Sequence, residues 1–156
     1  MPIPRSQLRL TPDELDEVFA REKTAHVATV SPDGEPHVVP LWFAWLGGAM
    51  YFTSLRRSRR ASDVEHGSRV SVCVDGGDSY ADLHGVVLYG RLEEVTDEGE
   101  RKKAAKAFGD KHWKGMEVPE RRSHTWLVLR PDRTVSWDFK KIPAGRDRQR
   151  QTSEGS

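Results

Sequence analysis

The chain has 156 residues, of which 36% are hydrophobic and 31% are charged, values typical of one globular domain. No apolar run reaches the roughly 18 residues that a membrane-spanning helix needs, and the first ten residues lack the apolar stretch of a secretory signal, so we expect a cytoplasmic protein. The net charge of +1 argues against a dedicated nucleic-acid-binding protein, and the single cysteine, Cys73, excludes an internal disulfide framework.

The first elements in chain order are a helix and a strand. Thr11 can cap a helix in which Pro12 takes the first position, and Glu14 can complete a capping box. Leu15, Val18 and Phe19 form its apolar face, and the helix should end near Arg21. Residues 25–30 then predict a strand, and the segment 31–34 (SPDG) predicts a tight turn.

The second predicted strand, from His37 to Leu46, is apolar on both faces. A strand in a sheet with one wet face alternates with polar residues, so we expect this strand to be covered on both sides. Pro40 removes one ladder hydrogen bond, which indicates a bulge, a sheet edge or a bound group lying against the strand. Gly47 and Gly48 predict a primed hairpin turn into a third strand over 50–53.

The remaining pattern predicts a loop with a short helix after Ser54 and a helix from Asp97 to Phe108, with Glu100 completing a second capping box. Further strands are expected over 69–75, 83–94, 124–130 and 134–139. No crossover helices separate the first three strands, which argues against a doubly wound parallel sheet. We therefore predict a mainly β, antiparallel fold closed into a small barrel over residues 11–139. Residues 1–10 form an N-terminal extension, and 140–156 form a basic tail that should be disordered.

Several common chemistries have no support in the sequence. The six histidines are scattered, without an HExxH motif or close ligand spacing, so no metal site is predicted. GxSxG, GxGxxG and GxxxxGK[ST] motifs are absent. Cys73 lies among valines in a predicted strand, where a buried, inert thiol is the expected reading. No catalytic acid or base can be named.

One cluster does suggest binding chemistry. Thr53 and Ser54 at a strand end are followed by four arginines, which can bind a phosphate dianion through paired, charge-assisted hydrogen bonds: Arg56, Arg57, Arg59 and Arg60. The alternative is a solvated loop whose arginines pair with Asp63 and Glu65. From the residues alone, both readings stay open.

The strings GEPHVVPLWFAWLGGAMYFTS and RRSRRASDVEHGSRVSV, with ATVSPDG before them and LRPDRTVSWDF after them, resemble the pyridoxamine 5'-phosphate oxidase-like split β-barrel proteins. The similarity is greatest to the flavin and deazaflavin oxidoreductase branch common in actinobacteria. It implies a six- to seven-stranded FMN-binding split barrel that forms a homodimer, with two cofactor sites at the subunit interface.

Carried over by position, the resemblance implies that Val39, Pro40, Leu41 and Trp42 lie along the flavin or deazaflavin ring. It places Thr53 and Ser54 at the ribityl or phosphate region, and Arg60 at the phosphate, with Arg57 and Arg59 as neighbours. Asp63 stands where many members carry Asn, which adds a negative charge near the phosphate. Trp42 and Trp45 can instead be core or interface aromatics, and Trp113 can either wall a substrate pocket or serve as a surface anchor. Trp126 and Trp137 are expected to pack in the closing strands.

The leading hypothesis is an oxidoreductase that transfers a hydride between a flavin-type cofactor and a small organic substrate. The resemblance to the actinobacterial branch favours coenzyme F420 over FMN, and several arginines beyond the phosphate ligand also suit a cofactor tail with several negative charges. The alternatives are a non-catalytic carrier of F420, of a flavin-related ligand or of haem, and a nucleic-acid accessory module that uses the arginine loop and tail.

Overall fold

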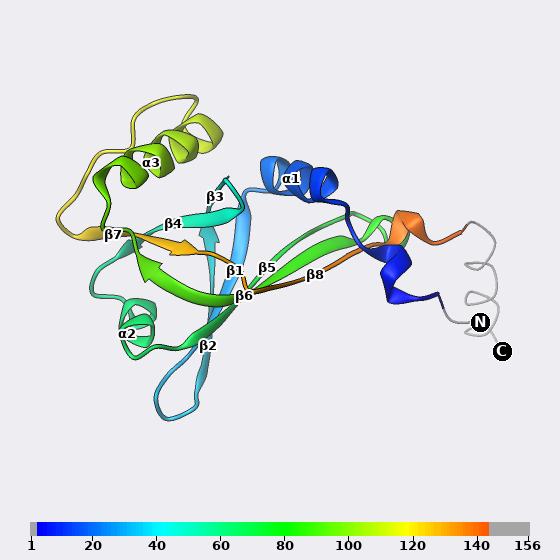
Figure 1. Ribbon diagram of the computed structural model, residues 1–156, viewed down its shortest axis with the longest axis horizontal. Coiled ribbons are helices and arrows are strands. Elements are labelled where there is room, and N and C mark those ends of the chain that lie inside the picture. The colour runs from blue at the N-terminus through cyan, green and yellow to red at the C-terminus, as the bar shows by residue number, and fades with distance from the viewer. Residues whose placement is uncertain (1–2, 144–156) are drawn as a thin grey trace.

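A computed structural model describes residues 3–143, and no helix in this range is long and apolar enough to cross a membrane (Figure 1). Three α-helices and eight strands form the framework, supplemented by three short 3-10 helices. The α-helices are α1 (Pro12–Arg21), α2 (Arg59–Glu65) and α3 (Glu98–His112), and the 3-10 helices are η1 (Arg5–Leu8), η2 (Tyr80–Asp82) and η3 (Phe139–Lys141). The strands are β1 (Thr24–Val30), β2 (Pro36–Trp42), β3 (Ala44–Leu46), β4 (Ala49–Leu55), β5 (Arg69–Gly76), β6 (His84–Glu94), β7 (His124–Leu129) and β8 (Arg133–Asp138).

The strands form one antiparallel sheet in the order β2-β1-β5-β6-β7-β4-β3, with β8 also paired to β6. β2 and β3 stand at opposite ends of this order although only Phe43 separates them in the chain. The continuity of the chain at Phe43 therefore brings the two ends together and curls the sheet (Figure 1). The predicted antiparallel, mainly β, barrel-like fold is confirmed. The predicted single strand from His37 to Leu46 is wrong, because its two halves pair with different neighbours, β1 and β4.

Two apolar clusters lie on the two sides of this sheet. Alternation along β4 places Met50 and Phe52 in the larger cluster, together with Phe43, inside the curled sheet. Tyr51 faces the other way and packs with Phe108 of α3 in the second cluster. Figure 1 shows α3 beside β4 and β7, with α2 at a different edge of the sheet. β4 is thus buried on both faces, and its side chains reach two separate environments.

Local signals fix the helix starts and one turn. Thr11 and Glu14 form the predicted capping box of α1, and Gly47 and Gly48 both adopt positive φ in the predicted two-residue hairpin. Asp97 caps α3 by accepting from the Glu100 amide at 2.7 Å, but the reciprocal half of the second predicted box is not formed. The Glu100 carboxylate accepts from Tyr51 at 2.8 Å instead, and it also contacts Arg130. α3 continues to His112, one turn beyond the predicted end.

The outward face of β2 is not covered within the described chain. Val38 is 62% exposed and Trp42 is 48% exposed, because β2 pairs only with β1 and, of the ring contacts in the described chain, this face has one, from His112 of α3 onto Trp42. The prediction that the strand is covered on both sides is therefore not met by one copy of residues 3–143. Pro40 lies on this edge strand, where its missing amide hydrogen is tolerated.

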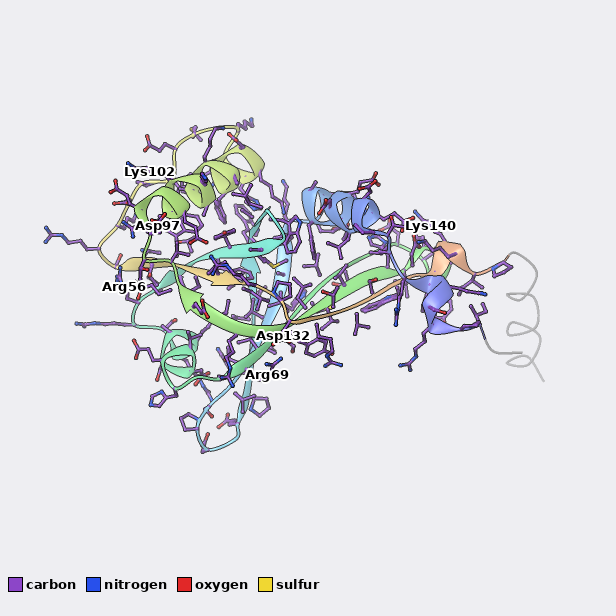
Figure 2. All side chains as sticks on the ribbon, in the orientation of Figure 1. Arg56, Arg69, Asp97, Lys102, Asp132 and Lys140 are labelled. Atoms are coloured by element: carbon purple, nitrogen blue, oxygen red, sulfur yellow. The ribbon has the colours of Figure 1, made fainter. Side chains whose placement is uncertain are left out.

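Both ends of the described chain lie at the end of the molecule away from α2 and α3 (Figure 1). The Leu10 amide donates to Ser136 Oγ at 3.0 Å, and Lys141 Nζ donates to the Arg9 carbonyl at 2.7 Å, so residues near position 10 pack beside β8 and η3. Arg69 and Asp132 form a two-bond ion pair at 2.8 Å where β7 leads into β8 (Figure 2). Of the tail predicted to be disordered, 140–143 is described and begins in η3, while 144–156 lies outside the described residues.

Candidate functional site

The four arginines that follow β4 do not converge. Arg56 pairs with Glu94 at 2.9 Å, and Arg59 lies 3.6 Å from Glu35. Arg57 is exposed and has no carboxylate within 4.0 Å in the described part of the chain, whereas Arg60 is buried. The alternative in which the loop pairs with Asp63 and Glu65 is also not observed, since the partners are carboxylates from β6 and from the β1–β2 turn.

Arg60 is a buried cation with an incomplete set of partners. Its side chain is only 7% exposed, and Nη2 donates to Ser54 Oγ at 2.7 Å. Arg60 Nε has no hydrogen-bond partner, and among residues 3–143 no carboxylate lies within 4.0 Å of the guanidinium. Burial lowers the pKa of Arg60 below its ordinary value. Because an uncompensated buried charge is costly, this arrangement is suited to receive an anion.

Local capping determines where Arg60 lies. Ser58 is the N-cap of α2, and its hydroxyl accepts from the Ala61 amide at 3.1 Å. The first turn of the helix therefore begins directly after the loop, and the second helical residue, Arg60, is turned back toward Ser54 at the end of β4. Ser58 Oγ also lies 3.5 Å from Ser54 Oγ, the hydroxyl that accepts from Arg60.

Asp63 lies one turn further along α2 and is 2% exposed. Its carboxylate accepts a hydrogen bond of 2.7 Å from Thr29 Oγ1, which ties α2 to β1. Asp63 does not form an ion pair with Arg60 within 4.0 Å. The two buried, oppositely charged side chains thus have separate partners, and the Asp63 carboxylate holds the helix against the sheet.

Thr53 and Ser54 were expected to act together, but the structure separates them. Successive residues of a strand face opposite sides of a sheet, so Ser54 meets Arg60 while Thr53 lines a cleft beneath α3. The same alternation divides the four β2 residues assigned to the ring. Val39 and Leu41 are half-buried, with Leu41 packed against the larger cluster, whereas Pro40 and Trp42 are exposed. Only Pro40 and Trp42 are available to a group bound outside the sheet.

Trp42 is held from one side by the end of α3. Its ring stacks on His112 with centroids 4.8 Å apart and planes 9° apart. His112 Nε2 lies 2.8 Å from the Phe43 carbonyl, the point where β2 gives way to β3. Burial lowers the pKa of His112, which favours the neutral ring as a donor to that carbonyl. Trp45 packs against Phe19 with centroids 4.5 Å apart, so it is a packing residue.

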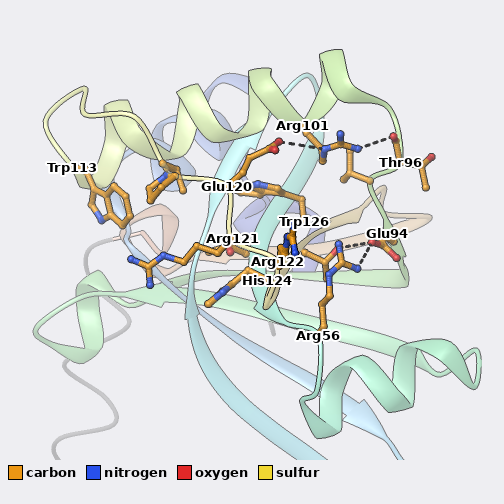
Figure 3. Close-up of a pocket in the computed structure, with 15 residues that line it drawn as sticks. Arg56, Glu94, Thr96, Arg101, Trp113, Glu120, Arg121, Arg122, His124 and Trp126 are labelled. Carbon is orange, nitrogen blue, oxygen red and sulfur yellow. Dashed lines mark hydrogen bonds and ion pairs between the residues drawn. The ribbon is translucent and has the colours of Figure 1, made fainter.

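The cleft beneath α3 has a volume of about 680 Å³ and is shown in Figure 3. Its walls come from α3, from the segment 113–122 after this helix, and from the facing ends of β6 and β7. Trp113 lines it, in agreement with one of the two readings of this residue, and so does Trp126, which was expected only to pack. Sequence reasoning did not assign Arg101, Arg121, Arg122 or His124 to a site. The pair Arg121-Arg122 shortly before a strand was the one available signal.

The charges of the cleft are partly neutralised. Glu94 accepts from Thr125 at 2.7 Å and from Arg56 at 2.9 Å, and these two donors hold the pKa of Glu94 below its ordinary value. Arg101 donates to the Thr96 carbonyl at 2.7 Å and lies 3.8 Å from Glu120 (Figure 3). The remaining arginines of the cleft, Arg121 and Arg122, are exposed and have no carboxylate within 4.0 Å in the range 3–143.

Metal binding and thiol chemistry have little support in the described residues. In the described residues, no three His, Cys, Asp or Glu side chains gather as a metal site would require. Cys73 is half-buried on β5 rather than fully buried, and burial raises its thiol pKa, which disfavours the reactive thiolate.

The fold is a curled antiparallel sheet, with the buried Arg60 beside the end of β4. The chain matches the family model of pyridoxamine 5'-phosphate oxidase over residues 11–138, and it belongs to this family. None of the curated proteins compared with the chain matches it.

Among the solved structures that are similar to the chain are the following three. A conserved hypothetical protein of Mycobacterium tuberculosis has a TM-score of 0.80 at 23% identity, over 90% of this chain and 92% of that one. The FAD- and heme-binding protein of Mycobacterium smegmatis has a TM-score of 0.73 at 18% identity, over 96% and 80%. An FAD-binding protein of Mesorhizobium loti has a TM-score of 0.65 at 25% identity, over 81% and 94%.

Proposed function

We propose that the protein is an oxidoreductase that uses a flavin-type cofactor, with coenzyme F420 favoured over FMN, to transfer a hydride to or from a small organic substrate. The observation that carries the proposal is Arg60, a buried guanidinium whose hydrogen bond in the described chain is to the Ser54 hydroxyl and which has no anionic partner there within 4.0 Å. The phosphate of a flavin-type cofactor would supply the missing negative charge.

Other residues have supporting roles in this proposal. Arg57 is exposed without a carboxylate partner among residues 3–143, and Arg59 is only loosely paired at 3.6 Å, so both are available to further negative charges of a cofactor tail. Thr53 would meet the part of the cofactor that enters the cleft, and Pro40 and Trp42 would lie against the ring. The bound ring supplies the hydride chemistry. The chain orients it, neutralises its phosphate and excludes water.

A homodimer is part of the proposal. Val38, Pro40 and Trp42 form an exposed, mainly apolar face on the edge strand β2. A second copy seated on this face would bury the side chains that one copy leaves exposed and would enclose the cofactor ring between the subunits.

The experiment that tests this function is a parallel equilibrium titration of the full chain with FMN, FAD and coenzyme F420. Native protein should bind one of them with micromolar or tighter affinity. Arg60→Lys should retain part of that affinity and Arg60→Ala should lose it, by at least about tenfold, because a charge-assisted hydrogen bond disappears. Lys103→Ala, which removes an exposed charge from α3, is the matched control and should bind as native protein does. Equal binding by the Arg60→Ala variant would contradict the assignment.

A non-catalytic binder of a flavin-related ligand or of haem is the second candidate, and one side chain favours the haem variant. His124 lines the cleft with Trp113 and Trp126, and its Nδ1 lies 2.9 Å from Ser123 Oγ, which leaves Nε2 for a ligand. The similar protein of M. smegmatis, which binds FAD and heme, makes this candidate relevant. Haem titration followed by the Soret band, with His124→Ala beside native protein, tests it. A Soret shift that disappears in this variant, without turnover in any reductase assay, would support the binder.

A further inference from the structure

Arg121 and Arg122 are two cations of the cleft for which the described chain provides no counter-charge. The cleft is lined by four arginines and two glutamates; Arg56 is occupied by Glu94 and Arg101 by Glu120. Figure 3 shows Arg121 and Arg122 on the strand-side wall of the cleft, next to His124. The unpaired positive charge therefore lies at the cleft and is not cancelled by its glutamates.

Another part of the cleft lining is aromatic and uncharged, and it is formed by Trp113 and Trp126. Phe108 of α3 packs edge-on against Trp113, with centroids 6.2 Å apart and planes at 87°, and against Trp126, with centroids 5.7 Å apart and planes at 77°. Both tryptophans line the cleft, so this three-ring cluster offers a fixed apolar surface. A cavity of about 680 Å³ is within the size range of small-molecule sites.

The segment that carries the arginines is anchored where α3 ends. The Trp113 and Gly115 amides both donate to the Gly109 carbonyl, at 2.9 Å and 3.0 Å. Gly109 has no room for a side chain, because an added Cβ would overlap the Met116 carbonyl. The chain is thus folded back tightly on α3, which fixes Trp113 before the segment crosses to β7.

We propose that this cleft binds the carboxylate of a planar organic acid, with the acid group on Arg121 and Arg122 and the ring against Trp113 and Trp126. The inference rests on the proposed function, for which it names the substrate class. Thr53, which would contact the cofactor, lines the same cleft, so an acid held there lies beside the cofactor's proposed place. Ser54 and Arg60 lie on the other face of β4, so the acid group and the cofactor phosphate have separate partners.

The test is isothermal titration calorimetry of the full chain, without cofactor, with 1-naphthoate and with its neutral isostere 1-naphthamide. Native protein should bind the acid saturably. The Arg121→Gln/Arg122→Gln variant should bind it at least about tenfold more weakly, because charge-assisted hydrogen bonds are lost. The amide should bind both proteins equally. Lys103→Gln/Arg133→Gln removes two exposed charges outside the cleft and should bind the acid as native protein does.

Two outcomes would overturn the inference: no binding of 1-naphthoate to native protein, or equal binding to native protein and the Arg121→Gln/Arg122→Gln variant. A third arm titrates F420 and FMN into the same proteins. If the variant loses affinity for F420 alone and keeps its affinity for 1-naphthoate, the two arginines hold the acidic tail of the cofactor and the substrate inference is wrong. Failure of the proposed function would be seen separately, as native protein that binds no flavin or F420.

Discussion

Arg60 and Ser54 form a 2.7 Å hydrogen bond between the first turn of α2 and the end of β4, and it is the only hydrogen bond of the Arg60 side chain within residues 3–143. Most buried charges in proteins are paired, and a guanidinium held by one neutral hydroxyl lowers stability unless a ligand compensates it. The fold thus keeps a cation in an unfavourable state at the place where a cofactor phosphate is proposed, a trade of stability for binding that is common at functional sites.

Replacing Arg60 by an apolar residue of similar length should therefore stabilise the ligand-free protein. We expect Arg60→Met to raise the thermal midpoint by a few degrees, equivalent to about 1–2 kcal/mol, because the unpaired buried charge is removed. The same variant should no longer be stabilised by added FMN or F420. Differential scanning calorimetry with and without cofactor measures both effects. Arg57→Met, at an exposed position, is the control for stability; a lower midpoint for Arg60→Met than for this control would refute the argument.

A substitution of Asp63 tests how a nearby negative charge affects cofactor binding at Arg60. Asp63→Asn keeps an oxygen that can accept from Thr29 but removes a buried negative charge one helical turn from Arg60. A phosphate-bearing cofactor should then bind several-fold more tightly, because repulsion between two anions is lost. Glu65→Gln removes an exposed carboxylate from the same helix and should change little, since solvent screens it. Equilibrium titration of both variants with the cofactor measures this difference. The electrostatic argument is refuted if Asp63→Asn binds the cofactor no more tightly than Glu65→Gln does.

The exposed face of β2 predicts the state of association. Val38→Asp places a carboxylate in the apolar face proposed to contact a second copy, and desolvating this charge would cost several kcal/mol. Native protein should sediment as a dimer in analytical ultracentrifugation, and Val38→Asp should sediment as a monomer. Met116→Asp changes a residue that is equally exposed but lies in the segment after α3, and it should remain dimeric. Identical sedimentation of all three proteins would exclude β2 as the interface.

Lys111 gives stability an unusual pH dependence. Its Nζ donates to the Phe19 carbonyl at 2.7 Å and stands 3.5 Å from the centre of the Phe43 ring. Burial lowers its pKa to about 8, whereas a lysine in the unfolded chain titrates near its ordinary value of about 10.4. Between these two pH values the unfolded chain binds more protons, so this group makes the protein more stable as the pH rises.

Urea unfolding at several pH values tests whether the free energy of unfolding increases with pH, as the lowered pKa of Lys111 requires. Between about pH 7.5 and pH 10, the contribution of Lys111 to the free energy of unfolding should increase by about 1–3 kcal/mol. The Lys111→Met variant lacks the titrating group, so the difference between native protein and variant isolates the effect from other ionisations. A constant difference across this range would show that the amine keeps an ordinary pKa in the folded protein.

Features decided within a few neighbouring residues could be predicted from the sequence. Thr11 and Glu14 form their capping box, and Gly47 and Gly48 turn the chain with the expected positive φ, because these geometries depend on side chains and backbone only a few positions apart. The series of strands was recognisable for the same reason, and short connections made an antiparallel sheet the expected result. The run of apolar residues across Phe43 did not reveal the break between β2 and β3, since composition does not show which neighbouring strand each half will pair with.

The candidate site was predicted in its residue types but not in its geometry. The sequence determined that several arginines follow a strand end and precede a short helix. Only the tertiary structure decided that Arg56 meets Glu94, 38 positions away, that Arg60 alone is buried, and that Thr53 and Ser54 serve opposite faces of β4. It also brought Arg121 and Arg122 to the cleft beneath α3. Such pairings follow from strand register and sheet curvature, which are set by the whole core and not by any local stretch of the chain.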